Sequence, residues 1–209
     1  MRSLDPAAAR ERAAELATRP ERAVLGITGA PAAGKSTYAE RLVAELIADG
    51  LKVASLPMDG YHLAQSALDT LGLASVKGAP HTFDAAGFVA LLRRLHERDG
   101  TVWAPRFDRE LEDSIAASIE IGPEIDLIVT EGNYLLLDQE PWATGRQLLD
   151  EVWYIDLPED VRHARLEARH RRFGRSSEEA HDRTYGSDER NAELIASTRP
   201  SADAVLHLS

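Results

Sequence analysis

Residues 29–36 read GAPAAGKS and fit the pattern G-x-x-x-x-G-K-[ST], whose residue types suit the binding of phosphate groups. Gly29 and Gly34 allow a tight turn whose backbone N–H groups can point inward at phosphate oxygens. Lys35 can reach the β- and γ-phosphates of a nucleotide, and the Ser36 hydroxyl can bind Mg²⁺. The expected nucleotide-binding residues are Gly29, Ala30, Pro31, Ala32, Ala33, Gly34, Lys35, Ser36 and Thr37.

The segments around this loop have the order that the motif requires. Residues 23–28, AVLGIT, form a short apolar run typical of a buried strand. Residues 36–50 follow with apolar side chains such as Leu42 and Leu46 at helical spacing, and Gly50 ends the pattern. The alternative is an accidental match, which a chain of this length produces on the order of 1% of the time. The strand, loop and helix together favour nucleotide binding.

Apolar runs and helical patterns alternate along the chain, which predicts an α/β protein with a parallel sheet covered by helices on both faces. With the loop motif, this pattern predicts a P-loop NTPase fold with a five-stranded parallel sheet. Strands are predicted at 23–28, 52–57, 125–132, 151–158 and 204–209. Helices are predicted at 6–18, 36–49, 84–99, 159–172 and 188–198. Alternating apolar residues at 114–122 suggest a hairpin with 101–105.

Charged residues follow the predicted strands, at the sheet edge where ligands of parallel sheets bind. Asp59 follows the second strand, Glu131 ends the third, and the basic stretch 168–176 follows the helix after the fourth. Individually these could be a turn residue, a strand-end acid and a solvated helix face. Together with a phosphate loop they form a set for phosphoryl transfer, with a base, an acid for Mg²⁺ and cations for the phosphoryl group.

Composition limits the remaining classes. The chain has 209 residues, 44% hydrophobic content and a net charge of −11, which predicts one domain over residues 1–209 and disfavours a nucleic-acid or anionic-membrane surface. Residues 1–20 are expected to form an N-terminal helix without the apolar centre of a signal peptide. There is no cysteine, and no apolar run is long enough for a membrane span. Cytoplasm is the expected location, and nothing in the sequence indicates an oligomeric state.

With these segments, the chain resembles the phosphoribulokinase/uridine kinase family of P-loop kinases. The resemblance is strongest to the branch with pantothenate kinase-like proteins and fructose transport system kinases, and runs from about residue 22 to the end. The segments that carry it are GITGAPAAGKST, LPMDGYH, KGAPHTFD (77–84), PRFDRELED (105–113), TEGNYLLL, DVRHARLEARH with GRS, and SDERNAELI (187–195).

The resemblance implies an ATP-dependent enzyme that uses Mg²⁺ and phosphorylates a hydroxyl of a small molecule. It places Asp59 as the acid that accepts the hydroxyl proton, with Lys35 and Arg169 as the other catalytic residues. Glu131, together with Ser36, is expected to hold the Mg²⁺ shell. Arg165 and Arg175 are expected to bind ATP in and beside a lid at about 169–178, and Asn191 to approach the adenine.

The resemblance also places the acceptor pocket between segments 59–62, 77–84 and 105–113. His81 stands where the family pattern leads us to expect Glu. The residues expected to contact the acceptor are Asp59, Tyr61, His62, His81, Asp84, Arg106 and Asp108, with Arg109 in the same segments.

Three questions stay open at this point. A sugar such as fructose is favoured as acceptor, with pantothenate or a nucleoside as alternatives; Tyr61, Phe83 and Phe107 could hold a nucleobase. A nucleotide-dependent switch protein with no acceptor is the alternative from another class. His163 and His170 lack the spacing of a metal site, so surface or lid roles are favoured for them.

Overall fold

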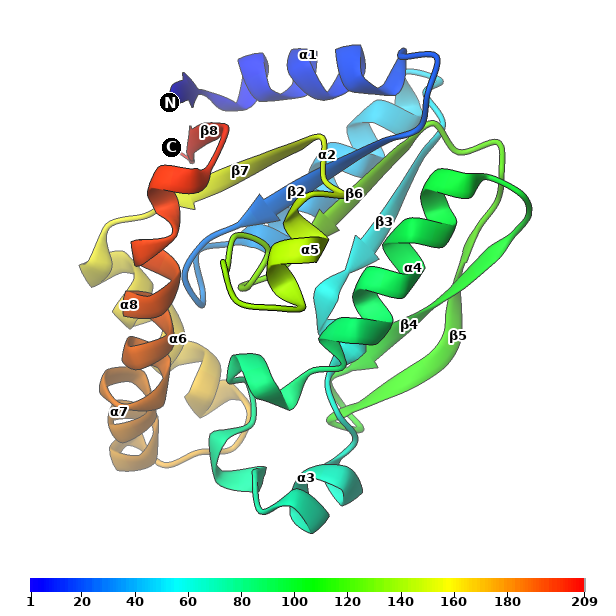
Figure 1. The fold of residues 1–209 in the computed structure, drawn as a ribbon. Helices are drawn as coiled ribbons and strands as arrows, with labels where there is room; N and C mark the ends of the chain where they lie inside the picture. Colours follow the sequence, from blue (N-terminus) through cyan, green and yellow to red (C-terminus); the bar gives the residue numbers. More distant parts are fainter. Residues whose placement is uncertain (209) are drawn as a thin grey trace.

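The computed structural model describes residues 1–208 and has a central sheet of six parallel strands (Figure 1). The spatial order is β1-β8-β7-β2-β6-β3. The strands are β1 (Arg2–Leu4), β2 (Ala23–Thr28), β3 (Val53–Pro57), β6 (Leu127–Glu131), β7 (Glu151–Asp156) and β8 (Ala204–His207). The predicted α/β class and parallel sheet are confirmed.

The sheet has one strand more than the five predicted. The additional strand, β1, pairs in parallel with β8, with Ser3 beside Val205. It has three residues, and only Leu4 is buried, so it carries too little apolar pattern to be predicted. By contrast, every residue of β2 is buried because β2 pairs with β6 on one side and β7 on the other.

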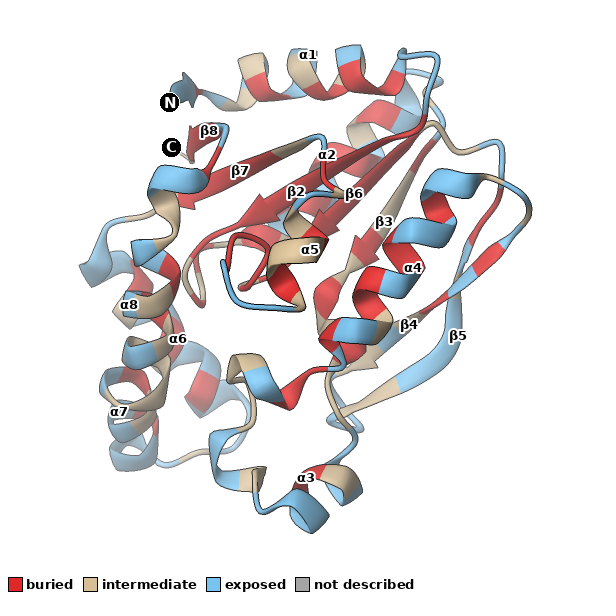
Figure 2. Ribbon diagram, in the orientation of Figure 1, coloured by how far each residue is buried: buried red, intermediate tan, exposed pale blue. Residues whose placement is uncertain are grey.

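Helices cover both faces of the sheet (Figure 2). Helices α1 (Pro6–Ala17) and α2 (Lys35–Ala48) pack on one face, where Leu16, Leu42 and Leu46 join the core formed with Leu25 and Ile27. Helices α4 (Ala85–Glu97) and α5 (Trp142–Arg146) pack on the other face. The predicted helices at 6–18, 36–49 and 84–99 agree with α1, α2 and α4 to within two residues at each end, whereas α5 was not predicted.

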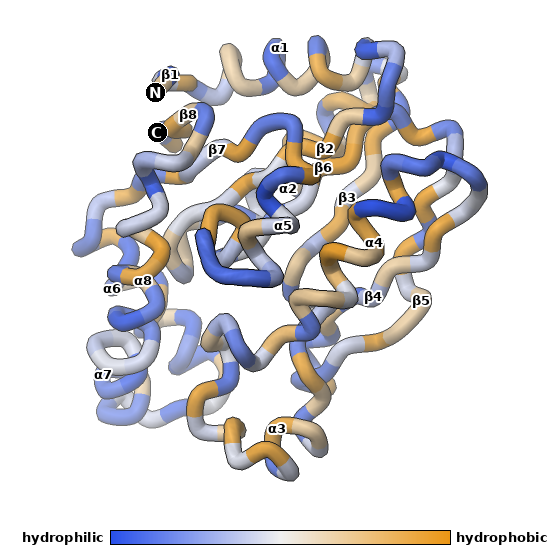
Figure 3. The backbone as a smooth tube through the Cα atoms, in the orientation of Figure 1, coloured by the Kyte–Doolittle hydropathy of each residue, from blue (hydrophilic) through white to orange (hydrophobic). Residues whose placement is uncertain are grey.

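The chain after β7 forms three successive helices, α6 (Glu159–Arg172), α7 (Ser177–Tyr185) and α8 (Ser187–Ser197). Figure 1 shows them as a group at one end of the sheet, and Figure 3 shows that α6 and α7 are largely hydrophilic. Helix α7 was not predicted, because its sequence SEEAHDRTY has little apolar periodicity. Among residues 1–208, no helix is both long and apolar enough to cross a membrane.

Strands β4 (Val102–Asp108) and β5 (Asp113–Ile121) form a separate antiparallel hairpin, longer than the one predicted. The hairpin packs closely on the 3₁₀ turn Met58–Tyr61 that follows β3. A Cβ atom on Gly60 would lie 2.3 Å from the Pro105 carbonyl oxygen, so only glycine allows this approach. A short helix α3 (Gln65–Leu71) follows the turn.

Candidate active site

The phosphate loop connects β2 to α2, and its backbone conformation fits the predicted role. Gly29, Ala32 and Gly34 have φ angles of 153°, 64° and 93°. The Lys35 ammonium donates hydrogen bonds to the carbonyl oxygens of Gly29 at 3.0 Å and Ala30 at 3.1 Å. Lys35 is only 8% exposed, so the loop wraps around its charge. The hydrogen-bond partners of the buried Lys35 ammonium are backbone carbonyl oxygens and not carboxylates. Such a cation is suited to an anionic ligand such as a phosphate chain.

Ser36 and Glu131 form the second part of the site. The Ser36 hydroxyl donates a hydrogen bond of 3.0 Å to Glu131 Oε1. The pairing of β2 with β6 puts Glu131 beside Ile27, at the strand end that leads into the loop. A hydroxyl and a carboxylate are hard oxygen ligands of the kind that Mg²⁺ takes from proteins, with the remaining ligands coming from water and substrate phosphates. These two residues therefore fit the predicted Mg²⁺ shell.

The two buried charges next to each other have shifted pKa values. Burial lowers the pKa of Lys35 to about 8, while the charges of Glu131 and Asp59 act in the opposite direction. Burial also raises the pKa of Glu131; Asp59 adds to this increase, and Lys35 opposes it. The strand pairing agrees with this proximity, because Pro57 at the end of β3 lies beside Glu131 and Asp59 follows two residues later.

Asp59 lies in the 3₁₀ turn after β3, at the carboxyl end of the sheet. Its Oδ2 accepts a hydrogen bond of 3.0 Å from Arg109 Nη2, in the turn between β4 and β5. The predicted base is therefore held by an arginine 50 residues away in the sequence. Sequence reasoning placed Arg109 near the pocket but did not identify this partner.

The three segments expected around the acceptor do come together, with His62 at their centre. The His62 ring lies 4.0 Å from the ring of Phe83 and 4.8 Å from that of Phe107. The Ser114 hydroxyl donates to the His62 carbonyl oxygen at 3.1 Å. Burial lowers the pKa of His62, and the cations Lys77 and Arg109 add to this, against the opposing charge of Asp59.

Several predicted acceptor residues have structural partners instead. Tyr61 is buried, with its ring 5.2 Å from that of Phe88 in the core. Asp84 accepts a hydrogen bond of 2.8 Å from Gly87 N and caps α4. Asp108 accepts hydrogen bonds from Glu110 N and Leu111 N, which stabilise the hairpin turn. The ring of Tyr61 is part of the core, and its contact with an acceptor stays a prediction.

His81 and Arg106 are both exposed, and the only described ion pair of Arg106 is a loose one of 3.9 Å to Asp108. Their contact with an acceptor stays a prediction. Lys77 was not predicted as a site residue, although it lies in the KGAPHTFD segment. Lys77 could have been identified from the sequence, because it is a cationic residue in a segment already assigned to the pocket.

The arginines of α6 differ in their relation to the loop. Arg165 Nη1 lies 3.5 Å from the position that a Cβ on Gly34 would occupy, directly against the phosphate loop. Arg169 follows Arg165 by four residues in α6, so the two side chains lie on the same face of the helix. Arg165 and Arg169 are therefore brought to the site.

Arg175 and Asn191 are not placed at the loop by any contact in residues 1–208. Arg175 follows Gly174 in the short connection between α6 and α7, within the predicted lid. Asn191 is half-buried on α8. Their roles, and the movement of a lid at about 169–178, stay predictions.

Two histidines of α6 bind acids at the start of α8. His163 Nε2 lies 2.8 Å from Glu189 Oε2, and His170 Nε2 lies 2.6 Å from Asp188 Oδ2. Arg162, also on α6, pairs with the same Glu189 carboxylate at 2.5 Å. These contacts fix the helix that carries Arg165 and Arg169, so the histidines have a positioning role that sequence reasoning left open between surface and lid.

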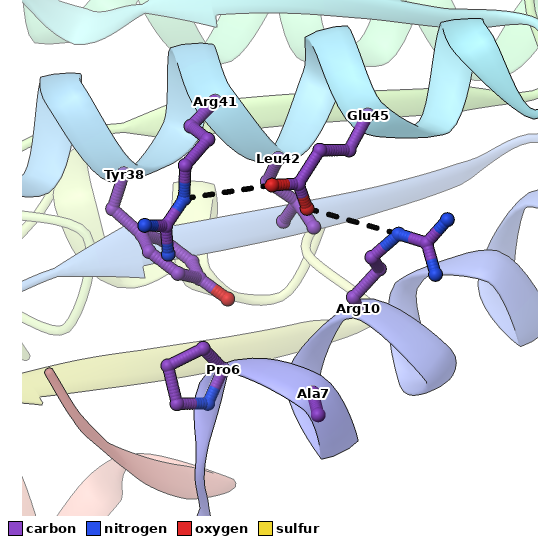
Figure 4. Close-up of a pocket in the computed structure, with 7 residues that line it drawn as sticks. All are labelled: Pro6, Ala7, Arg10, Tyr38, Arg41, Leu42 and Glu45. Carbon is purple, nitrogen blue, oxygen red and sulfur yellow. Dashed lines mark ion pairs between the residues drawn. The ribbon is translucent and has the colours of Figure 1, made fainter. Parts of the chain in front are cut away.

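A separate cavity of about 280 Å³ lies between α1 and α2 (Figure 4). In it, Arg10 and Arg41 each lie 3.7 Å from the Glu45 carboxylate. None of the predicted site residues lines it. Its lining residues are Pro6, Ala7, Arg10, Tyr38, Arg41, Leu42 and Glu45.

These features together define a P-loop nucleotide-binding protein. They are a parallel sheet with a phosphate loop that leads into α2, an acid at a strand end beside the serine of that loop, and arginines from a later helix. A sequence model of the family "Methylmalonyl Co-A mutase-associated GTPase MeaB" matches residues 4–65. That match includes the loop and Asp59 but not Glu131 or α6.

Longer similarities identify the family. "Putative uridine kinase C227.14" of Schizosaccharomyces pombe is 32% identical over 93% of this chain and 87% of its own length. A crystal structure described as a "putative fructose transport system kinase" from Silicibacter sp. TM1040 is 36% identical, with a TM-score of 0.88 over 97% of this chain and 99% of that one. YFH7 of Saccharomyces cerevisiae shares the fold, with a TM-score of 0.80 at 19% identity over 98% of this chain and 99% of that one.

The chain therefore belongs to the P-loop kinases of the uridine kinase/phosphoribulokinase type. It is an ATP-dependent kinase, and its substrate is a small molecule.

Proposed function

We propose that this kinase uses Mg²⁺ and transfers the γ-phosphoryl group of ATP to a hydroxyl of a small polyhydroxylated acceptor, a sugar such as fructose. The observation that carries the proposal is the convergence of Asp59, Lys35 and Glu131 at the carboxyl ends of the neighbouring strands β3, β2 and β6. A protein that only switches between nucleotide states needs no base aimed at an acceptor, whereas an alcohol kinase does.

Each residue has a role in this scheme. Bound Mg²⁺ supplies positive charge to the phosphates, and the Ser36 hydroxyl and Glu131 carboxylate would hold it. Lys35 binds the β- and γ-phosphates, and Arg165 and Arg169 bind phosphate oxygens with planar guanidinium groups. Asp59 accepts the proton of the attacking hydroxyl.

The arrangement of aromatic rings favours a sugar over a nucleoside. A nucleobase needs flat side chains with an open space between them. In this structure the His62 ring packs against both Phe83 and Phe107, and the Tyr61 ring is buried against Phe88, so each of these flat side chains already contacts another protein ring. The similar proteins include one named as a uridine kinase and one described as a fructose transport system kinase, so both acceptor classes belong in the test. Pantothenate is the third candidate.

The test is a coupled ADP-release assay with fructose, uridine, cytidine and pantothenate at saturating MgATP. We expect fructose to raise ATP consumption with the highest kcat/KM, and Asp59→Asn to abolish the increase. A nucleoside preferred by more than tenfold would contradict the sugar assignment. If no acceptor raises ATP consumption above the background rate, the switch function gains support instead.

A further inference from the structure

Two cations lie over one aromatic ring beside the predicted base. Lys77 Nζ is 5.6 Å and the Arg109 guanidinium carbon 5.8 Å from the centre of the Phe107 ring. The His62 ring packs on the same phenylalanine ring, with 4.8 Å between the ring centres, and Arg109 also pairs with Asp59 at 3.0 Å. The two cations, His62 and Asp59 therefore belong to one side of the acceptor region.

Lys77 has no carboxylate partner within the described residues. Its ammonium donates to the Glu112 carbonyl oxygen at 2.7 Å and to Gln65 Oε1 at 3.3 Å, which are both uncharged groups. Two of its three N–H donors are used, so one is left for a ligand.

Arg109 has an acidic partner, but that partner is the predicted base. Asp59 must offer its carboxylate oxygens to the acceptor hydroxyl if it is to accept the proton. Its ion pair with Arg109 occupies Oδ2, at 3.0 Å. Another acid of the hairpin, Asp108, accepts hydrogen bonds from two backbone N–H groups of its own turn. An incoming anion could thus pair with Arg109 and leave Asp59 free.

We propose that Lys77 and Arg109 bind an anionic group of the acceptor, so that the kinase prefers a sugar acid or a sugar phosphate over the uncharged sugar. This inference rests on the proposed function, because it concerns the acceptor of that same reaction. A carboxylate and a phosphate group share the chemistry that both cations recognise. The acceptor's anion lies on the hairpin side, and its reacting hydroxyl lies at Asp59.

The first experiment compares acceptors that differ in charge. Sorbitol and gluconate form the carboxylate pair, and fructose and fructose 6-phosphate form the phosphate pair. We expect the anionic member of at least one pair to have a kcat/KM about tenfold or more above that of its neutral partner. The pair that shows the difference identifies the anion. Equal or better use of the neutral member in both pairs overturns the inference.

The second experiment removes the unpaired cation. Lys77→Gln should raise KM for the anionic acceptor about tenfold with little change in kcat, and should leave the neutral acceptor unchanged. Lys77→Arg should restore most of the affinity. Lys52→Gln, at an exposed lysine outside the three acceptor segments, is the matched control. Calorimetric titration of the acceptor into enzyme with a non-hydrolysable ATP analogue gives the same comparison without turnover, and the anion's affinity should fall with added salt.

The two possible failures are distinct. If fructose or sorbitol is phosphorylated well and Lys77→Gln affects charged and neutral acceptors alike, the inference is wrong and the proposed function stands. If none of the four acceptors raises ATP consumption or binds in the titration, both are wrong.

Discussion

The Ser36 hydroxyl and the Glu131 carboxylate share a hydrogen bond of 3.0 Å although 95 residues separate them in the sequence. The contact exists because β2 and β6 are neighbours in the sheet. Glu131→Gln keeps the size of the side chain and its acceptor for Ser36 but removes the charge. We expect the Mg²⁺ concentration for half-maximal activity to rise about 10-fold or more. An unchanged Mg²⁺ dependence would contradict the metal assignment.

The same variant gives a prediction about stability. Burial raises the pKa of Glu131, which means that the folded protein disfavours its charged form. The empty Glu131→Gln enzyme should therefore be at least as stable as the wild type at pH 8, measured by thermal unfolding without nucleotide or metal. A lower melting temperature for the variant would mean that the carboxylate charge stabilises the fold.

Lys35 should carry most of the nucleotide affinity. A ligand that binds only the folded state raises the melting temperature, and MgATP should do so for the wild type. Lys35→Ala should lose most of that increase, because the loop amides alone do not offset the phosphate charge. Lys52→Ala, at an exposed lysine, should keep it. A full increase in Lys35→Ala would reject the phosphate-loop assignment.

Replacing Asp59 should lower turnover but leave ATP binding unchanged. Asp59→Asn removes the base and the ion pair with Arg109. We expect kcat to fall about 10²-fold or more, with the melting-temperature increase by MgATP retained. Near-normal turnover would place the base on another residue.

Replacing Arg169 should slow phosphoryl transfer without changing the stability of the fold. It makes no side-chain hydrogen bond or ion pair with any residue in 1–208, so Arg169→Ala should leave the free energy of unfolding unchanged. Turnover should fall about 10²-fold or more if its guanidinium binds the phosphoryl group in the transition state. Arg172→Ala, at an exposed residue of the same helix, is the control. Similar activities of the two variants would remove Arg169 from the catalytic set.

We expect His62 to make the free energy of unfolding depend on pH. Its pKa is lowered in the folded protein, so the unfolded chain takes up a proton first as the pH falls. The contribution of His62 is present above its unfolded pKa of about 6.5 and is lost progressively below it. Between pH 8 and 5.5, urea unfolding should show a smaller loss of stability in His62→Gln than in the wild type. His81→Gln, at an exposed histidine, should match the wild type.

The loop, Asp59 and Glu131 were predictable because each follows directly from a motif or from the end of a strong apolar strand. The hydrogen-bond partners were not, since Arg109 reaches Asp59 only through the packing of the hairpin on the 3₁₀ turn. Strand β1 was missed because pairing with β8, and not its own three residues, makes it a strand.

Asp84 has a structural role that the sequence could have indicated. An Asp three residues before Gly87, at the start of an apolar helical pattern, is typical of a helix cap, and the structure shows that cap. Tyr61 could not be assigned in the same way. The sequence gives no indication that its ring turns toward Phe88 while the neighbouring His62 turns toward Phe83 and Phe107.

The close approach of Gly60 to Pro105 has a consequence for engineering this enzyme. The turn that carries Asp59 and the hairpin that carries Arg109 have no room to slide past each other. A hairpin transplanted from a relative to change the acceptor would therefore displace the base as well. Exchanges that move residues 57–62 and 102–121 as one module should retain activity more often than exchanges of the hairpin by itself.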